Sequence, residues 1–306
     1  MSEKQKTLNK VYQFEGKGLH SGVISRMKIR PSEENTGIRF LRSDIGPDAY
    51  IEAISDYVTY TQRGTTFEKG QIRISTAEHL LAAFNGLGID NAIVELDSFE
   101  VPILDGSALP YTNAILKDGL AEQAAERLYY SIPEQISYRD EKSGSEITVL
   151  PADSFSVDLT IDFGSRVLGV QKAHYDENTD FASQIAPCKT FVFFHELEFL
   201  FKNNLIKGGD LENALVIVEN PVEEEELSRM AEIFNVEKIK RLESGYLDNV
   251  SLHFDNECAR HKLLDILGDF MLVGHRIKGK IIASKSGHKI NTTVARIIRE
   301  QLTKNI

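Results

Sequence analysis

Two side chains that bind divalent metals well, His261 and Asp265, lie four residues apart in a segment, residues 256–271, that has the pattern of a helix. Residues four apart on a helix lie one above the other, so this imidazole and this carboxylate can reach the same metal ion. A catalytic zinc site usually has three protein ligands and one open position for water. We therefore expect the rest of the chain to supply the third ligand and a group that transfers protons.

The same helix also fits a simpler interpretation. Lys262 and Asp269 fall on the same arc as His261 and Asp265, opposite an apolar arc. Such a helix is ordinarily amphipathic, with its polar arc in solvent, and a histidine-aspartate pair alone does not establish a metal site. The metal interpretation depends on whether other segments complete the set. The apolar arc comprises Leu263, Leu264, Leu267, Phe270 and Met271.

A second segment, residues 75–84, carries Glu78 and His79 near the start of another predicted helix. Adjacent helical residues project about 100° apart, so the two cannot easily bind one metal. They can serve one site in different ways, with His79 as a ligand and Glu78 as a proton-transfer group. The plainer alternative is that Glu78 is an acidic residue that stabilises the positive end of a helix.

Composition narrows the classes of protein that need to be considered. A chain of 306 residues fits one or two domains. No apolar run is long enough to span a bilayer, and no signal-peptide core follows the first residues. The two cysteines, Cys188 and Cys258, form no Cys-x-x-Cys pair, which favours a cytoplasmic location and argues against a thiolate zinc site. The net charge of −11 disfavours nucleic acid as a partner.

The two candidate helices fall in different halves of the chain. Residues 121–128, rich in alanine, glutamate and glutamine, are predicted to be a linker between an α+β half on either side. The order helix, glycine, strand occurs in both halves, at residues 76–96 and 257–283, and indicates two similar α/β layers. A glycine-rich turn carries His20, which we interpret as an exposed histidine of a hairpin.

Three segments of the second half have a distinctive composition. The phenylalanine-dense run at residues 191–201 is predicted to be a buried amphipathic helix, or alternatively an apolar slot for a lipid-like group. Residues 219–248 are strongly acidic and are predicted to form short amphipathic helices without chemistry. Residues 284–291, which include His288, are predicted to form a polar turn before a basic C-terminal helix.

Five motifs in a fixed order resemble a known family. Ser-Thr-Ala-Glu-His-Leu-Leu-Ala-Ala at 75–83 and His-Lys-Leu-Leu-Asp-Ile-Leu-Gly-Asp at 261–269 occur together with Gly-Leu-His-Ser-Gly at 18–22, Lys-Thr-Phe at 189–191 and Ser-Gly-His at 286–288. They closely resemble the UDP-3-O-acyl-N-acetylglucosamine deacetylases, a zinc amidase family that acts early in the synthesis of lipid A. The acidic segment looks longer than in typical members and little chain follows the last motif, but neither departure touches a catalytic motif.

The resemblance assigns roles to the candidate residues. It implies that His79, His261 and Asp265 hold zinc, in agreement with the helix geometry. It implies that Glu78 is the general base and that His288 is a second acid/base or charge-stabilising group.

Further roles follow from the same resemblance. It implies that Thr190 is an oxyanion donor, and Lys262 and Asp269 are similar to residues that contact substrate and orient the second histidine. Asp162 and Phe163 resemble positions near the nucleotide. The positions that match the family's acyl-chain passage are Phe191, Leu197, Ile206, Leu211 and Val216.

These features lead to a set of predictions about fold and function. We predict an α+β fold of two similar α/β layered halves packed together, with helices sandwiched between sheets and the active site between the halves. The domains are residues 1–125 and 126–306, the second with an acyl-passage insert at about 190–218 and an acidic helical insertion at about 219–248. The resemblance implies a cytoplasmic, monomeric enzyme that hydrolyses the N-acetyl group of UDP-3-O-(3-hydroxyacyl)-N-acetylglucosamine, the committed step of lipid A synthesis.

Two alternatives remain at the level of sequence. The first is a zinc hydrolase that acts on another N-acetyl sugar, which would not require an acylated UDP-sugar. The second is a non-catalytic protein that binds a nucleotide-sugar or a fatty acyl ligand. That protein would hold no stoichiometric metal, and its function would survive replacement of Glu78 by alanine.

Overall fold

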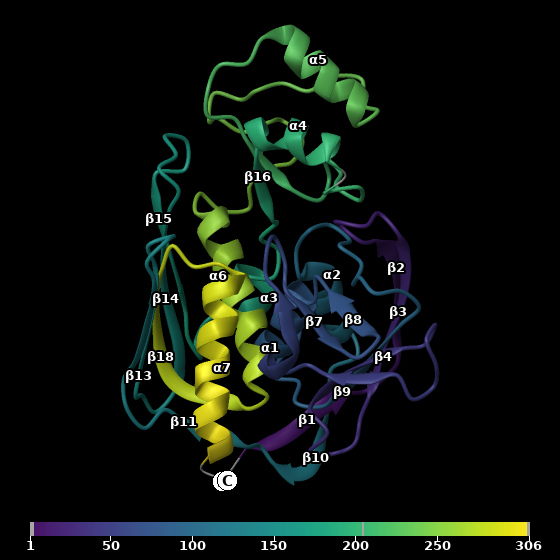
Figure 1. The fold of residues 1–306 in the computed structure, drawn as a ribbon, viewed down its shortest axis with the longest axis vertical. Coiled ribbons are helices and arrows are strands. Elements are labelled where there is room, and N and C mark those ends of the chain that lie inside the picture. Colours follow the sequence, from purple (N-terminus) through teal and green to yellow (C-terminus); the bar gives the residue numbers. More distant parts are fainter. Residues whose placement is uncertain (1–2, 204, 305–306) are drawn as a thin grey trace.

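The computed structural model describes residues 3–203 and 205–304 and shows a mixed α+β fold with two main sheets (Figure 1). The first main sheet has the strand order β2-β3-β9-β4-β5. Its central strand, β9, is antiparallel to β3 and parallel to β4. The strands are β2 (Tyr12–Lys17), β3 (Ile24–Pro31), β4 (Ile38–Arg42), β5 (Tyr50–Glu52) and β9 (Ala92–Leu96).

The second main sheet repeats this arrangement. Its strand order is β12-β13-β18-β14-β15, and its central strand β18 is antiparallel to β13 and parallel to β14. In each sheet the central strand is the last of the five in the sequence and follows a helix. The strands are β12 (Ile136–Asp140), β13 (Ser145–Leu150), β14 (Phe155–Asp162), β15 (Val170–Tyr175) and β18 (Arg276–Ser284), with β11 (Tyr129–Ser131) added beside β18.

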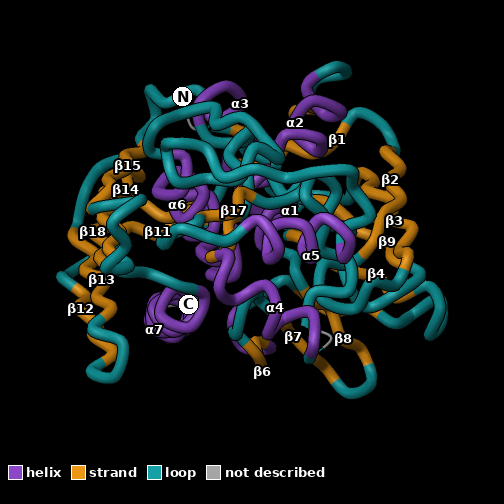
Figure 2. The backbone as a smooth tube through the Cα atoms, turned by 90° about the horizontal axis from the view of Figure 1, so that it is seen from above, coloured by secondary structure: helices purple, strands orange, loops and turns teal. Residues whose placement is uncertain are grey.

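Helices α1 (Glu78–Leu87), α6 (Glu257–Phe270) and α7 (His288–Lys304) lie between the two main sheets. Figure 2 shows the same layering from above. Each helix has an apolar face in one continuous core, and α1 and α6 approach so closely that a Cβ at Gly268 would lie 2.1 Å from the carbonyl oxygen of Glu78. The glycine therefore brings the two motif-bearing helices together.

The helix assignments need two corrections. The helix predicted within residues 75–84 begins at Glu78, extends to Leu87 and is ended by Gly88, whose φ of 76° is left-handed. His288 is the first residue of α7 and not part of a turn. His261, Asp265 and Asp269 of the polar arc of α6 are also buried, because the second sheet and α1 enclose this helix from several sides.

The remaining elements complete the first half and its connection to the second. The predicted linker at 121–128 is wrong, because β10 (Leu120–Glu126) pairs with β1 (Lys4–Leu8) in an antiparallel ladder. The exposure of its residues alternates, as in a strand with one covered face. Alanine and glutamate are uncommon in strands, so the composition did not indicate one. The other elements are η1 (Ser55–Tyr57), β6 (Val58–Tyr60), β7 (Thr66–Lys69), β8 (Ile72–Ser75), α2 (Leu109–Leu116), α3 (Phe181–Gln184) and η2 (Met271–Val273).

A small projecting part contains the phenylalanine-dense run and the acidic segment (top of Figure 1). The run divides into a strand and a helix instead of forming one helix. This part has its own apolar core, to which Leu197, Leu211 and Met230 contribute. Its elements are β16 (Phe191–Phe193), α4 (Phe194–Lys202), β17 (Leu215–Ile217) and α5 (Glu224–Ile233), the last being the helix of the acidic segment.

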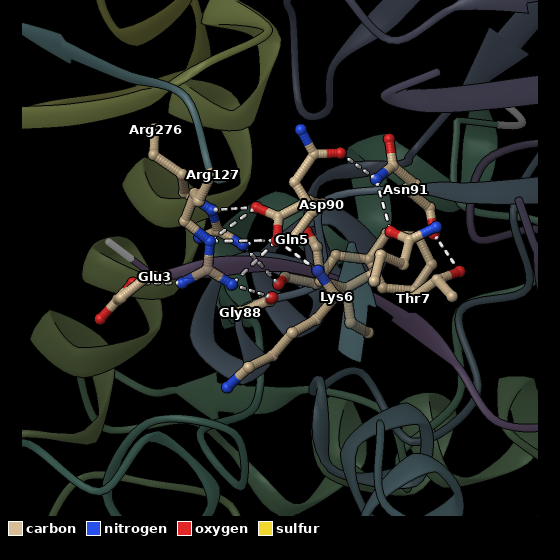
Figure 3. Close-up of polar contacts among 12 residues, drawn as sticks. Glu3, Gln5, Lys6, Thr7, Gly88, Asp90, Asn91, Arg127 and Arg276 are labelled. Carbon is tan, nitrogen blue, oxygen red and sulfur yellow. Dashed lines mark hydrogen bonds and ion pairs between the residues drawn. The ribbon is translucent and has the colours of Figure 1, made fainter. Parts of the chain in front are cut away.

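A polar cluster joins the halves at the C-terminal end of α1 (Figure 3). Arg276 of β18 donates to the carbonyl oxygens of Asn85 at 2.8 Å and Ile89 at 2.9 Å. Arg127 donates to the carboxylate of Asp90 and, at 2.7 Å, to the carbonyl oxygen of Gly88. Two guanidinium groups thus satisfy carbonyl groups at the negative end of the helix.

Within the described residues, no helix combines the length and the apolar character needed to cross a membrane.

Candidate metal centre and active site

A cavity of about 440 Å³ lies where residues of both halves and of the projecting part meet. Its wall includes Glu78 and His79 at the start of α1, and His261 and Asp265 of α6. It also includes His288, the first residue of α7. The starts of two helices and the face of a third therefore converge on one space.

Three of these side chains form a group suited to a metal ion. One nitrogen or oxygen of each of His79, His261 and Asp265 lies within 4.8 Å of the others, and all three residues are buried. The two imidazole Nε2 atoms are 3.8 and 3.5 Å from Oδ1 of Asp265. These separations suit three ligands around one ion better than direct hydrogen bonds between the ligands.

The hydrogen bonds of the group favour the same interpretation. Oδ1 of Asp265 is buried and has no hydrogen-bond partner among the described residues. His261 Nδ1 lies 3.0 Å from the carbonyl oxygen of Cys188, so Nδ1 carries the proton and Nε2 presents a lone pair to the centre. A bound cation would give both the unpaired Oδ1 of Asp265 and the lone pair of His261 Nε2 a partner.

The charges of the three side chains also suit metal ligands. Burial lowers the pKa of His79 to about 3 and, against the opposing charge of Asp265, also lowers that of His261, so both imidazoles are neutral at neutral pH. Burial opposes ionisation of Asp265, but the positive charges of Lys262 and His288 outweigh it and lower the pKa of Asp265. Lys262 Nζ lies 2.6 Å from Asp265 Oδ2, which leaves Oδ1 for the centre.

Glu78 occupies a buried position beside this group. Burial raises its pKa to about 7, although the charge of His288 acts in the opposite direction. The backbone N–H of Thr65 donates to Glu78 Oε2 at 3.1 Å. A carboxyl group with a pKa near neutrality can accept a proton and return it, as a general base requires.

The backbone just before Glu78 is unusual. Thr76 has a φ of 57°, in the left-handed region that β-branched residues rarely adopt. Its hydroxyl donates to the buried carboxylate of Glu100 at 2.9 Å, and its N–H donates to the carbonyl oxygen of Thr65 at 3.0 Å. These bonds hold the turn that directs Glu78 and His79 into the cavity.

His288 lies next to Glu78, with its Nε2 3.8 Å from Glu78 Oε1. Its Nδ1 lies 2.9 Å from Asp269 Oδ2. Burial disfavours the charged imidazole, but Asp269, Asp265 and Glu78 outweigh it and raise the pKa of His288 to about 9. The imidazole is therefore protonated at neutral pH and places a positive charge beside the metal group.

Most of the remaining predicted residues line the cavity wall, but Leu211 and Asp162 do not. Thr190, just before β16, and Lys262 of α6 line it. Phe163 follows β14 and contacts Phe191, with ring centroids 5.5 Å apart. Leu211 is absent from the lining and packs in the core of the projecting part. The other predicted acyl-passage residues that line the cavity are Leu197, Ile206 and Val216.

Sequence reasoning missed several residues that support the site. Thr65 and Asn291 both donate to Asp269, at 2.6 and 2.9 Å. His20, interpreted as an exposed histidine of a hairpin, is partly buried and places its nitrogens 3.1 Å from the carbonyl oxygens of Arg63 and Leu205. The glycines around His20 and the polar loop before Thr65 gave no periodic signal that could have placed either residue.

A buried two-histidine, one-aspartate group beside a carboxyl group and a protonated histidine defines the chain as a metal-dependent hydrolase. Comparison with known proteins names the family. The chain matches the family LpxC, UDP-3-O-acyl N-acetylglycosamine deacetylase, over residues 5–239 and 236–300. The chain belongs to this family, as the five motifs predicted.

Individual relatives agree with the family match. The bifunctional enzymes LpxC/FabZ of Porphyromonas gingivalis and Bacteroides thetaiotaomicron are 45% and 41% identical to this chain over 99% and 98% of its length. The chain spans only 66% and 65% of those proteins. A UDP-3-O-acyl-N-acetylglucosamine deacetylase of Chromohalobacter salexigens is 36% identical over 97% of this chain and 91% of its own length.

Proposed function

We propose that the chain hydrolyses the N-acetyl group of UDP-3-O-(3-hydroxyacyl)-N-acetylglucosamine, releasing acetate and the free amine, in the committed step of lipid A synthesis. The observation that carries the proposal is the convergence of His79, His261 and Asp265 in a cavity that Glu78 and His288 also line. Family membership supplies the substrate. Zinc bound by the three ligands would lower the pKa of a water molecule toward about 7 and polarise the acetyl carbonyl.

The residues of the chain divide the proton transfers between them. Glu78, whose pKa burial raises to about 7, takes the proton from the attacking water. The protonated imidazole of His288 stabilises the negative charge that develops on the carbonyl oxygen. The hydroxyl of Thr190, on the same cavity wall, donates to that oxygen. Glu78 or His288 then protonates the leaving amine.

The cavity also offers separate surfaces for the ends of the substrate. The apolar part, formed by Leu197, Ile206 and Val216, suits the 3-O-acyl chain. Phe163, half exposed beside Phe191, suits the flat uracil ring at the mouth. Leu211 lies behind this wall and would affect the acyl chain through the residues that it packs against.

The domain division at residues 125 and 126 belongs to this proposal, with the active site between the halves. The repeated strand order supports two similar halves, and ligands from α1 and α6 support a site between them. The cytoplasmic location, the monomeric state and the absence of a nucleic-acid partner remain predictions.

The test is deacetylation of the acylated UDP-sugar by the purified chain, with and without a chelator, together with metal analysis. We expect about one zinc ion per chain, and activity that the chelator removes and added zinc restores. His79→Ala should abolish both metal binding and activity. The matched control is His174→Ala, because His174 lies on β15 and pairs with Asp158 away from the cavity.

Two outcomes would favour the alternatives. Equal turnover of an N-acetyl sugar without the acyl chain would indicate a different hydrolase. Ligand binding without stoichiometric metal, unaffected by Glu78→Ala, would indicate a binding protein.

A further inference from the structure

Thr65 occupies a position between the two proton-transfer groups of the site. It lies in the loop between β6 and β7, and its side chain is fully buried. Its hydroxyl donates to Asp269 Oδ1 at 2.6 Å, and its backbone N–H donates to Glu78 Oε2 at 3.1 Å. A single residue thus contacts both the carboxyl group of α1 and the aspartate that holds His288.

The hydroxyl has a distinct role at Asp269. The other carboxylate oxygen, Oδ2, is shared by His288 Nδ1 at 2.9 Å and Asn291 Nδ2 at 2.9 Å. Oδ1 accepts a side-chain hydrogen bond from Thr65 alone among the described residues. Without that hydroxyl one oxygen of a buried carboxylate would have no partner, and the carboxylate could rotate away from His288.

The backbone explains how Thr65 comes so close. A Cβ at the preceding residue, Gly64, would lie 3.0 Å from Glu78 Oε1 and 3.4 Å from His20 Nε2. The carbonyl oxygen of Thr65 accepts from the N–H of Thr76 at 3.0 Å. The residue is therefore fixed by its N–H, its carbonyl and its hydroxyl, each bonded to a segment that carries part of the site.

We propose that Thr65 is a positioning residue, whose hydroxyl fixes the Asp269 carboxylate so that His288 is held at its distance from Glu78. This inference rests on the proposed deacetylase function. It assigns Thr65 no contact with the substrate or the metal. It predicts that the hydroxyl contributes to turnover and not to substrate binding or to folding.

The test compares three variants. Thr65→Val keeps the volume and the backbone contact with Glu78 but removes the hydroxyl, whereas Thr65→Ser keeps the hydroxyl. The matched control is Thr66→Val, because Thr66 is equally buried and its hydroxyl pairs with Ser75 Oγ at 2.8 Å instead of with the site. The measurements are kcat and KM for the acylated UDP-sugar, zinc content and thermal unfolding.

We expect Thr65→Val to lower kcat by about 10- to 100-fold, the usual effect of losing a partner behind a site residue. KM and zinc content should stay within about twofold, and Thr65→Ser should recover most of kcat, because the effect lies in the orientation of His288. Wild-type kcat in Thr65→Val would overturn the proposal, and so would a serine variant as slow as the valine variant. Loss of zinc or failure to fold in Thr65→Val would also overturn it, since the role would then be structural.

A second measurement separates this inference from the proposed function. The Nδ1 proton of His288, which is bonded to Asp269, can be followed by NMR in protein with labelled histidine and assigned by its disappearance in His288→Gln. We expect Thr65→Val to shift or broaden this resonance and Thr66→Val to leave it unchanged. If the wild-type chain is inactive toward the acylated UDP-sugar, the proposed function fails. The NMR result tests the positioning role separately, because an unchanged His288 resonance in Thr65→Val would refute that role whether or not the chain is active.

Discussion

Adding a single methyl group at Gly268 should separate the two helices that carry the proposed metal ligands. Alanine is favoured over glycine inside a helix by about 1 kcal/mol, so helix propensity alone predicts that Gly268→Ala stabilises the protein. The structure predicts the opposite, because the new Cβ would lie 2.1 Å from the Glu78 carbonyl oxygen. That oxygen belongs to the backbone of α1 and cannot be relieved by rotating a side chain.

The geometry sets the size of the expected effect. Carbon contacts below 3.0 Å essentially do not occur, so 3.0 minus 2.1 leaves about 0.9 Å by which α1 must withdraw from α6. Overpacking of this kind costs about 1–3 kcal/mol, and the gain in propensity offsets about 1 kcal/mol of it. A net loss of up to about 2 kcal/mol corresponds to a fall in melting temperature of a few degrees for a chain of this size, at about 2–4 °C per kcal/mol.

The displacement should affect activity more than stability. Glu78 and His79 move with α1, while His261 and Asp265 remain on α6, and a misplacement of about 1 Å can cost about 100-fold in rate. We therefore expect zinc affinity to fall and kcat to fall by about 100-fold at a temperature where the variant is folded. The assays are metal titration, calorimetry and steady-state kinetics.

A matched control distinguishes geometry from stability. Ile298→Val, in the buried core on α7, should cost about 0.5–1.5 kcal/mol while leaving α1 and α6 in place. Its melting temperature should fall by a similar amount with little change in kcat. A Gly268→Ala protein with an unchanged or higher melting temperature and normal activity would refute the reasoning.

Three further predictions concern the site. Metal analysis should show that His261→Ala loses zinc and that Glu78→Gln retains it, while kinetics should show that Glu78→Gln loses about 10²–10⁴-fold in kcat. Equal zinc loss in both variants would contradict the assignment of His261 as a ligand and of Glu78 as a base. The rate should rise as Glu78 deprotonates through its pKa of about 7 and fall as His288 deprotonates through its pKa of about 9, so kcat/KM plotted against pH should be bell-shaped. His288→Gln should remove the fall at high pH. An unaltered fall in that variant would show that the protonated histidine is not needed for catalysis. Val216→Phe should narrow the apolar part of the cavity and lower kcat/KM for long acyl chains more than for short ones. If wild type and variant depend on acyl length in the same way, the acyl chain binds elsewhere.

The metal group could be predicted from sequence because a helix places residues four apart on one side. That periodicity places His261 and Asp265 side by side but does not by itself establish a metal site, and the family resemblance implied the third ligand, His79. The burial of the polar arc of α6 could not be predicted from the sequence. The apolar pattern of α6 matches that of a surface helix, and only the packing of α1 against Gly268 shows that its polar side is also enclosed.

Other features depend on contacts that the sequence does not encode locally. Strand β10 has a helix-like composition, and its pairing with β1, more than 100 residues away, overrides that preference. The phenylalanine-dense run divides at Phe194 because β16 pairs with β17, a partner beyond α4. Thr65 lies in a loop and is 204 residues from the aspartate that it contacts, so no spacing rule could have connected the two.

The arginine cluster at the end of α1 has a consequence for the order in which the chain folds. Arg276 supplies donors to the carbonyl groups of Asn85 and Ile89 from a strand nearly 200 residues later. Until β18 has been synthesised and paired, α1 has its local cap at Gly88 but lacks the additional donors that this arginine supplies to those carbonyl groups. Completion of the second half therefore adds hydrogen bonds to the helix that carries Glu78 and His79, and the two halves should unfold as one cooperative unit.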